Sequence, residues 1–256
     1  MINVMIYNEN VHETTVESVR AIYPDGIHGA IKGFLEKDGA VGKIRCATLK
    51  DHRETLNKEA LEDTDVLIWW GHMKHHEVDD EAVARVVRRV LDGMGLIVLH
   101  SGHASKPFQK LMGTDTPLLR WREAGEKVRL WNIIRNHPIA QGLDESFVVP
   151  HDETYGEPFG IPAPDEQVFI SWFQGGEIFR SGCTWRRGEG KIFYFQNGHE
   201  TFPVYHQKEV QLVIANAVKW ACPPLRICLR DRGPGNAPAL EKYESDSGGF
   251  TPVTRG

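Results

Sequence analysis

The feature that most constrains the fold is a regular alternation of short apolar runs and amphipathic stretches over residues 1–113. The run at 65–70 is apolar on both faces, as a central strand of a parallel sheet is. The stretch at 79–93 begins with acidic residues and repeats valines at helical spacing. In chain order, the segments are 2–9 (strand), 27–39 (helix), 43–49 (strand), 65–70 (strand), 79–93 (helix), 95–100 (strand) and 106–113 (helix). Such alternation predicts a parallel, doubly wound sheet with right-handed crossovers.

The second half of the chain has a different pattern, in which strands follow one another with short connections. Hairpin turns are predicted at 175–176 and 186–190, and a final amphipathic helix at 208–221. The strand-like segments are 127–134, 146–152, 167–173, 177–185 and 191–199. The sequence therefore predicts an α/β fold whose mainly parallel central sheet gains antiparallel strands from the second half.

Composition limits the class of protein and its partners. The length fits one large α/β domain, expected over residues 1–222, followed by a tail at 223–256 that is rich in proline, glycine and charge. The formal net charge is −5 without a long basic run, so we expect no nucleic-acid partner. No apolar run approaches the roughly 20 residues of a membrane span, and the N-terminus lacks a signal-peptide pattern. We expect a cytoplasmic protein with reduced cysteines; the sequence permits a homo-oligomer without specifying one.

Four of the 12 histidines stand directly after predicted strands. They are His72, His100, His151 and His199. In open α/β sheets, ligands bind beyond the carboxyl ends of the strands. We therefore expect these histidines to share one cleft, provided that the later strands run in the matching direction.

Imidazoles with a nearby carboxylate suit a divalent transition metal, with zinc as the expected ion. The predicted ligands are His72, His100, Glu153 and His199, or three of them. His103 or His151 is expected to act as general base, and substrate contacts are expected from Tyr155, Glu200 and Trp70. For each histidine taken singly, a satisfied loop position is the simpler interpretation. Glycine-rich phosphate loops are absent, so no nucleotide is expected.

Ser101 introduces an alternative chemistry. It lies between a predicted strand and helix, as the nucleophile of a G-x-S-x-G elbow does, but the glycine spacing is incomplete. A serine mechanism also needs a base oriented by an acid, for which His199 and Glu153 are candidates. The simpler role for Ser101 is to cap the turn that follows it.

Several segments carry a resemblance to a known family. They are "DVLIWWGHMKHHEV", "GLIVLHSGHASK", "HPIAQGLDESFVVPHDETYGEPFGIPAPDE" and "RSGCTWRRGEGKIFYFQNGHETFPVYH". With them, residues 1–222 resemble the trehalose-utilisation (ThuA-like) family. The resemblance implies a flavodoxin-like three-layer sandwich, similar to class I glutamine amidotransferases. It also implies a role in bacterial catabolism of trehalose or its 3-keto derivatives, linked to a partner sugar oxidoreductase.

The chain departs from the glutaminases of that fold at one decisive position. A glutaminase carries a cysteine nucleophile after a central strand, whereas the corresponding turn here reads "LHSGH" with no cysteine nearby. Glutamine amidotransferase chemistry is therefore not expected. We expect a metal-assisted hydrolase, lyase or isomerase acting on a sugar. A non-enzymatic sugar-binding accessory protein and a serine hydrolase using Ser101 remain as alternatives.

Overall fold

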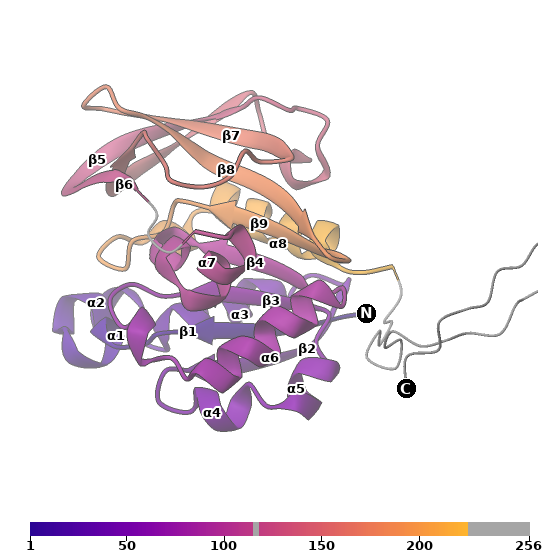
Figure 1. Cartoon of the computed structure of the whole chain (residues 1–256). Helices are drawn as coiled ribbons and strands as arrows, with labels where there is room; N and C mark the ends of the chain where they lie inside the picture. The colour runs from indigo at the N-terminus through magenta and orange to yellow at the C-terminus, as the bar shows by residue number, and fades with distance from the viewer. Residues whose placement is uncertain (115–117, 225–256) are drawn as a thin grey trace, which may run out of the picture.

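The computed structural model describes residues 1–114 and 118–224, and they contain one nine-stranded mixed sheet (Figure 1). Its strand order is β2-β1-β3-β4-β9-β8-β7-β5-β6. The strands are β1 (Ile2–Asn8), β2 (Val41–Thr48), β3 (Val66–Trp70), β4 (Gly95–Leu99), β5 (Arg120–Asn132), β6 (Ser146–Gly156), β7 (Glu166–Phe173), β8 (Ile178–Arg187) and β9 (Gly190–Phe195). Most of the predicted tail lies outside the described residues.

The sheet has a parallel half and an antiparallel half, which confirms the predicted mixed α/β fold. Strands β2, β1, β3, β4 and β9 are parallel to one another. Strands β9, β8, β7, β5 and β6 pair antiparallel along the rest of the sheet. The last strand in sequence, β9, thus joins the two halves by pairing with β4 on one side and β8 on the other.

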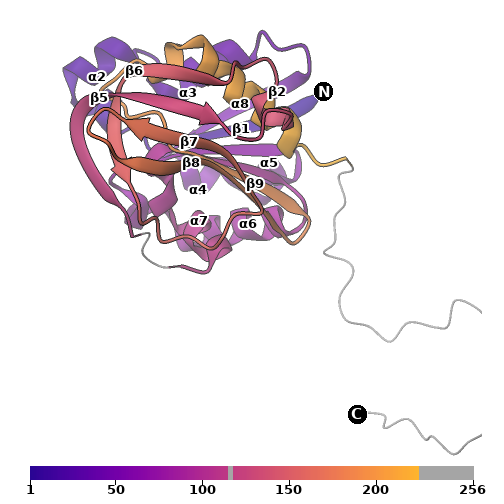
Figure 2. The same ribbon diagram turned by 90° about the horizontal axis from the view of Figure 1, so that it is seen from above.

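Helices cover both faces of the parallel half. Figures 1 and 2 show α3 and α8 on one face and α6 and α7 on the other. The helices are α1 (His12–Thr15), α2 (Glu17–Ile22), α3 (Gly26–Leu35), α4 (His52–Thr55), α5 (Lys58–Glu62), α6 (Asp80–Leu91), α7 (Lys106–Met112) and α8 (Lys208–Ala221). Short 3-10 turns lie at η1 (His75–Glu77), η2 (His100–Ala104), η3 (Pro138–Ala140) and η4 (Val204–His206). No helix in the described part of the chain is long and apolar enough to cross a membrane.

Helix α6 shows why the longer elements were predictable. The Asp79 carboxylate caps it by accepting the backbone N–H groups of Glu81 and Ala82. Val83 and Val86 are fully buried on its inner face. Capping and periodicity thus agree, and the helix ends two residues before the predicted boundary.

The missed elements are short or polar. Helices α1, α2, α4 and α5 have four to six residues each, which is too short for a hydrophobic period to show. Strand β5 begins at Arg120, seven residues before the prediction, because its first residues are polar and mostly exposed. Strand β9 ends at Phe195, four residues early, because the chain turns there toward the sheet edge.

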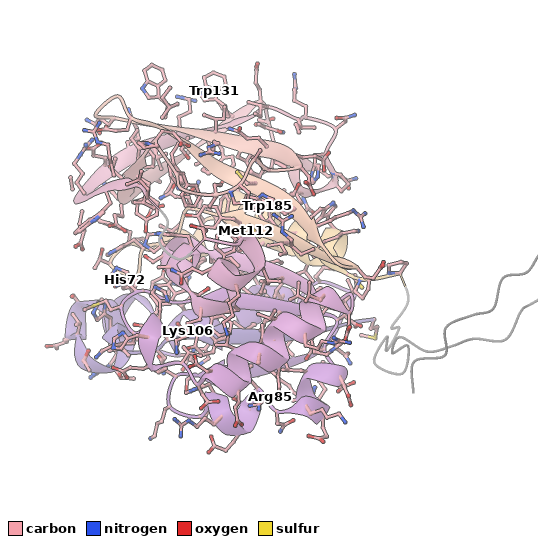
Figure 3. All side chains as sticks on the ribbon, viewed as in Figure 1. His72, Arg85, Lys106, Met112, Trp131 and Trp185 are labelled. Carbon is pink, nitrogen blue, oxygen red and sulfur yellow. The ribbon has the colours of Figure 1, made fainter. Side chains whose placement is uncertain are left out.

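The tryptophans divide between core and surface. Trp69, Trp70 and Trp185 are buried, as expected for core residues. Trp121 and Trp172 are instead 67% and 56% exposed. Figure 3 shows Trp185 between the two halves of the sheet, whereas Trp131 projects from the outer face of the antiparallel half.

His137 caps the short 3-10 turn η3, which begins at Pro138. Its Nδ1 accepts the backbone N–H of Ile139 at 3.1 Å, which requires that nitrogen to be unprotonated. Its Nε2 lies 3.2 Å from a carboxylate oxygen of Glu166. Burial lowers the pKa of His137 below its usual 6.5, although Glu166 opposes the shift.

We expect this histidine to make folding sensitive to acid. Below about pH 6.5 the unfolded chain takes up the proton before the folded chain does, so stability is lost as the pH falls through the folded pKa. A His137→Asn variant keeps an oxygen to cap Ile139 but does not titrate. Urea unfolding at about pH 7.5 and 5.5 should show a smaller acid loss in the variant. Equal losses in both proteins would contradict this role.

Candidate functional site

Three histidines reach one edge of the sheet because β3, β4 and β9 run parallel. Trp70 at the end of β3 pairs with Leu99 at the end of β4, and Leu99 pairs with Phe195 at the end of β9. The three strands therefore end at one level. The chain leaves them with His72, His100 and His199, respectively. His72 lies where the antiparallel strands meet the N-terminal half of the molecule (Figure 3).

The carboxylate of the site comes from β6, at the far end of the sheet order. The pairing of β5 with β6 is irregular between Arg122 and Val128, and such bulges bend and twist a strand pair. Strand β6 contacts β8, although β7 and β5 separate them in the sheet order. The curled antiparallel half thereby places Glu153 over the ends of the parallel strands.

The four predicted metal ligands come together. One donor atom from each of His72, His100, Glu153 and His199 lies within 4.8 Å of the others. His100 Nε2 is 3.1 Å from Glu153 Oε2, and His199 Nε2 is 3.9 Å from the same oxygen. His100, Glu153 and His199 are buried, and His72 is partly exposed.

The donors of this cluster fit a divalent transition metal. Although His100 Nε2 and Glu153 Oε2 are in contact, they are not aligned as a hydrogen bond, and neither atom has a hydrogen-bond partner among the described residues. Two ligands of one tetrahedral zinc, each at about 2.0–2.1 Å, lie about 3.4 Å apart. The distances of 3.1 and 3.9 Å fall on either side of that value. Unpaired buried donors with this spacing are what a bound cation would satisfy.

The backbone of His100 directs its ring into the cluster. The residue has a φ of 52°, which is rare for a residue other than glycine and costs roughly 1–3 kcal/mol. Its Nδ1 donates to the backbone carbonyl of Gln196 at 2.9 Å, which leaves Nε2 toward Glu153. A metal-binding histidine characteristically donates its other ring N–H in this way.

The electrostatics of the cluster favour anionic carboxylates. Burial alone would lower the pKa of His100, but Glu153, Asp152 and Glu200 outweigh it and raise that pKa to about 9. Burial and the charge of His100 together lower the pKa of His199 to about 4. Burial opposes ionisation of Glu153 and Glu200, yet the surrounding histidines hold both pKa values below the usual range.

Asp152 fixes the positions of two of the cluster residues. It is fully buried, and its Oδ1 accepts the backbone N–H groups of Glu153 and His199 at 2.9 and 3.1 Å. Its Oδ2 accepts the side-chain N–H of Asn197 and the backbone N–H of Gly198. One carboxylate thus ties β6 to the segment that leaves β9.

Glu9 performs the same task for the loop that carries His72. It follows β1 and is buried, and its carboxylate accepts the backbone N–H groups of His72, Met73 and Lys74 at 2.8–3.1 Å. The backbone-binding roles of Glu9 and Asp152 are not predicted from the sequence. Nothing in the sequence distinguishes a carboxylate that binds backbone from one that is exposed.

Glu200 was expected to contact substrate, but its side chain is almost completely buried against histidines. Its Oε1 lies 2.9 Å from His72 Nδ1 and also contacts His12 Nδ1. His12 was not among the predicted site residues. It lies on the short helix α1, four residues after β1, and no strand end marks it in the sequence.

A cavity of about 230 Å³ opens beside the cluster. It is lined by His72, Ser101, His103, Ala104, Leu119, Trp121, Glu153 and Tyr155. The Ser101 hydroxyl pairs with the Tyr155 hydroxyl at 3.0 Å. Among the described residues it makes no hydrogen bond to the following turn or to an imidazole. Burial lowers the pKa of His103 to about 3.

Two predicted site residues lie apart from this cavity. His151 is exposed, its Nδ1 contacts the Gly125 carbonyl, and its ring stacks on Phe202, which in turn contacts His199. Trp70 is only 1% exposed and donates its indole N–H to the Gly198 carbonyl. It packs behind the cluster and is too deeply buried to contact a ligand.

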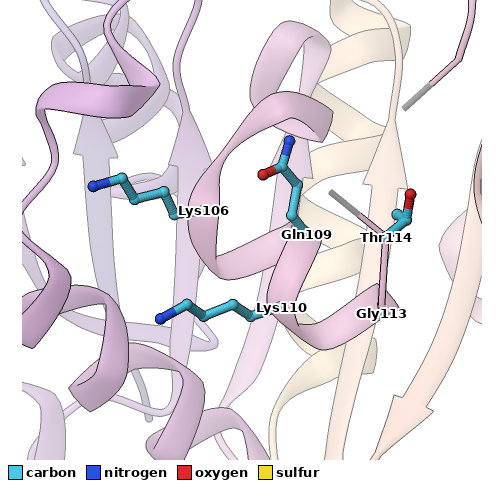
Figure 4. A pocket seen from close by; sticks show the side chains of 5 residues that line it. All are labelled: Lys106, Gln109, Lys110, Gly113 and Thr114. Atoms are coloured by element: carbon cyan, nitrogen blue, oxygen red, sulfur yellow. The ribbon is translucent and has the colours of Figure 1, made fainter. Parts of the chain in front are cut away.

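A larger hollow of about 600 Å³ lies over α7 (Figure 4). Lys106, Gln109, Lys110, Gly113 and Thr114 line it. The Lys106 ammonium already donates to the Val78 carbonyl and to Asp80. The described residues of this lining include no histidine or carboxylate, and the smaller cavity beside the cluster is the better candidate for chemistry.

Sequence comparison identifies the family. The profile described as "ThuA: Trehalose utilisation" matches residues 3–221, which is most of the chain. The chain belongs to the ThuA family. A comparison with curated proteins found no match.

Solved structures share this fold at low sequence identity. A ThuA-like protein from Parabacteroides merdae has a TM-score of 0.64 and 15% identity, covering 86% of this chain and 89% of that one. A ThuA-like protein from Bacteroides uniformis has a TM-score of 0.61 and 16% identity, covering 86% and 91%. A cytoplasmic protein from Salmonella typhimurium has a TM-score of 0.57 and 10% identity, covering 86% and 99%. These similarities support the fold.

We expect Asp152→Asn to destabilise the protein strongly for an isosteric change. The new amide places an N–H group against two N–H donors, whichever way it is turned, and leaves buried donors unpaired. The free energy of unfolding in urea should fall by about 1–3 kcal/mol. Asp144→Asn, at an exposed position, is the control and should change little. A loss no larger than in the control would show that Asp152 does not hold the site.

Proposed function

We propose that this ThuA-family protein is a metal-dependent enzyme of sugar catabolism that hydrolyses, eliminates or isomerises a keto-sugar. The observation that carries the proposal is the cluster of His72, His100, Glu153 and His199, with its unpaired donors, beside a cavity that an exposed tryptophan lines. The family's description as trehalose utilisation supports a sugar as the substrate.

The metal, which we propose to be zinc, would be held by His100, Glu153 and His199, with His72 as a fourth ligand. Three protein ligands leave an open position on a catalytic ion. When bound there, zinc polarises a carbonyl or acidifies a water. The chain would contribute the preorganised donors, because Asp152 and Glu9 already hold the backbone on which these ligands stand.

The cavity residues suggest how a sugar would be oriented. The paired hydroxyl groups of Ser101 and Tyr155 offer hydrogen bonds to sugar hydroxyl groups. Of the two histidines predicted as general base, His103 lines the cavity and His151 does not. We therefore assign proton transfer to His103. A volume of about 230 Å³ is below the roughly 300–1,000 Å³ of typical ligand pockets, which favours one sugar ring at the site.

The same proposal includes the relation of the fold, the cellular location and the source of the substrate. The parallel half of the sheet with helices on both faces supports a flavodoxin-like core related to class I glutamine amidotransferases. The description of a Salmonella neighbour as cytoplasmic supports a cytoplasmic location. A keto-sugar substrate would be supplied by oxidation of a sugar hydroxyl, which is the reaction of a partner oxidoreductase.

Metal content tests the proposal directly. Protein purified without an affinity tag should carry at least one equivalent of zinc per chain, measured by plasma mass spectrometry. His100→Ala removes a buried ligand and should carry about one equivalent less. His76→Ala is the matched control, because that imidazole lies on the loop after His72 but is exposed. A wild-type protein that stays free of metal after dialysis against zinc would overturn the metal mechanism and favour the sugar-binding accessory protein.

Sugar binding provides a second test that does not need turnover. Trp121 is exposed in the cavity lining, and its flat ring can pack against the C–H face of a pyranose. We expect Trp121→Ala to weaken binding of a 3-keto-glucoside by about fivefold or more, since burial of an aromatic face contributes about 1 kcal/mol or more. Trp121→Phe should restore part of the affinity. Exposed Trp172, on the outer face of the sheet, is the control position, and Trp172→Ala should leave Kd unchanged.

A further inference from the structure

We propose that His12, His72 and Glu200 form a second divalent-cation position directly beside the first, so that the site holds a pair of ions. Their donor atoms lie within 4.8 Å of one another. The inference rests on the proposed function, because it adds an ion to the same site. The first position keeps three ligands without His72, which is enough for a catalytic ion.

Glu200 is the centre of this second group. The residue is fully buried, and its ion-pair contacts within the described residues are all with histidines. Its Oε1 faces both His12 Nδ1 and His72 Nδ1. Its Oε2 has no hydrogen-bond partner and lies 3.7 Å from His199 Nε2, a ligand of the first position. A buried carboxylate with no lysine or arginine beside it requires another source of positive charge.

A simpler interpretation is that Glu200 only orients two imidazoles by accepting their N–H groups. The contact with His72 argues against this. His72 Nδ1 lies 2.9 Å from Glu200 Oε1, yet the two atoms are not aligned as a hydrogen bond, and the buried nitrogen has no other hydrogen-bond partner. The His100–Glu153 contact of the first cluster has the same character. Two neighbouring nitrogen–oxygen contacts without alignment indicate two places at which a cation belongs.

The arrangement also suggests what the pair of ions would bind. The two oxygens of Glu200 face different groups, Oε1 toward His12 and His72 and Oε2 toward His199. A carboxylate placed in this way bridges two ions, and paired ions in hydrolytic and transfer enzymes lie about 3.5–4 Å apart. Such a pair binds two neighbouring oxygens of a ligand. The adjacent hydroxyl and carbonyl oxygens of a keto-sugar meet that requirement.

Metal stoichiometry tests the second position without an activity assay. Untagged wild-type protein is stripped with a chelator, dialysed against zinc and washed, and zinc per chain is measured by plasma mass spectrometry. We expect about two equivalents in wild type, about one in His12→Ala and about one in His100→Ala. His76→Ala, an exposed histidine of the same region, should keep two. Circular dichroism confirms that each variant is folded, and the rise in Tm caused by zinc should be smaller in both ligand variants than in wild type.

The outcomes separate this inference from the proposed function. One equivalent in wild type that His12→Ala retains and His100→Ala loses overturns the second position and leaves the proposed function standing. One equivalent lost in His12→Ala but kept in His100→Ala supports the position at Glu200 and overturns the first. No zinc in wild type overturns both. Two equivalents, each lost with its own histidine, establish the pair.

Discussion

The parallel pairing of β9 with β4 is the interaction on which the site depends. It brings the last strand of the sheet back to its centre, so that the chain leaving Phe195 reaches the edge where the chain leaves Leu99. His199 meets His100 for that reason alone. The same strand pairs antiparallel with β8, and the strands that follow β8 across the sheet curl back to deliver Glu153 from the opposite side. The pairing of β9 with β4 therefore determines how His100, His199 and Glu153 lie relative to one another.

The residues of this site lower the stability of the folded protein. Three carboxylates, those of Asp152, Glu153 and Glu200, are buried together, and His100 adopts a backbone conformation that residues other than glycine rarely adopt. Buried charges destabilise a protein unless they are paired and hydrogen-bonded. Asp152 is satisfied by four N–H groups, but Glu153 and Glu200 each keep a carboxylate oxygen with no hydrogen-bond partner. Both of these carboxylates face histidines, and a bound cation there would add positive charge beside them.

The sequence could predict the part of the site that strand ends determine. Apolar runs that stop at a histidine mark His72, His100 and His199, because parallel strands end at one edge. His12, Glu9 and the backbone role of Asp152 have no such marker, since a short helix or a buried carboxylate looks like any surface segment in a single sequence. The sequence also does not predict which of these side chains are buried and which are exposed. Trp70 and Glu200 were expected to contact substrate and are buried, whereas the exposed Trp121, which was not a predicted site residue, lines the cavity. Which residues remain exposed depends on how β5 and β6 curl, and no local pattern encodes that curl.

The histidine and glutamate that follow β9 both contact the cluster, although they are neighbours in the chain. Here His199 uses Nδ1 to contact the Thr201 hydroxyl at 2.7 Å, while Nε2 faces Glu153. Glu200 turns Oε1 toward His12 and His72, and its Oε2 lies 3.7 Å from His199 Nε2. The Ser101 hydroxyl, in turn, pairs with the Tyr155 hydroxyl at 3.0 Å. The strand ends thus present imidazole and carboxylate donors in two groups, each with its atoms within 4.8 Å of one another, and the proposed cation sites rest on this arrangement.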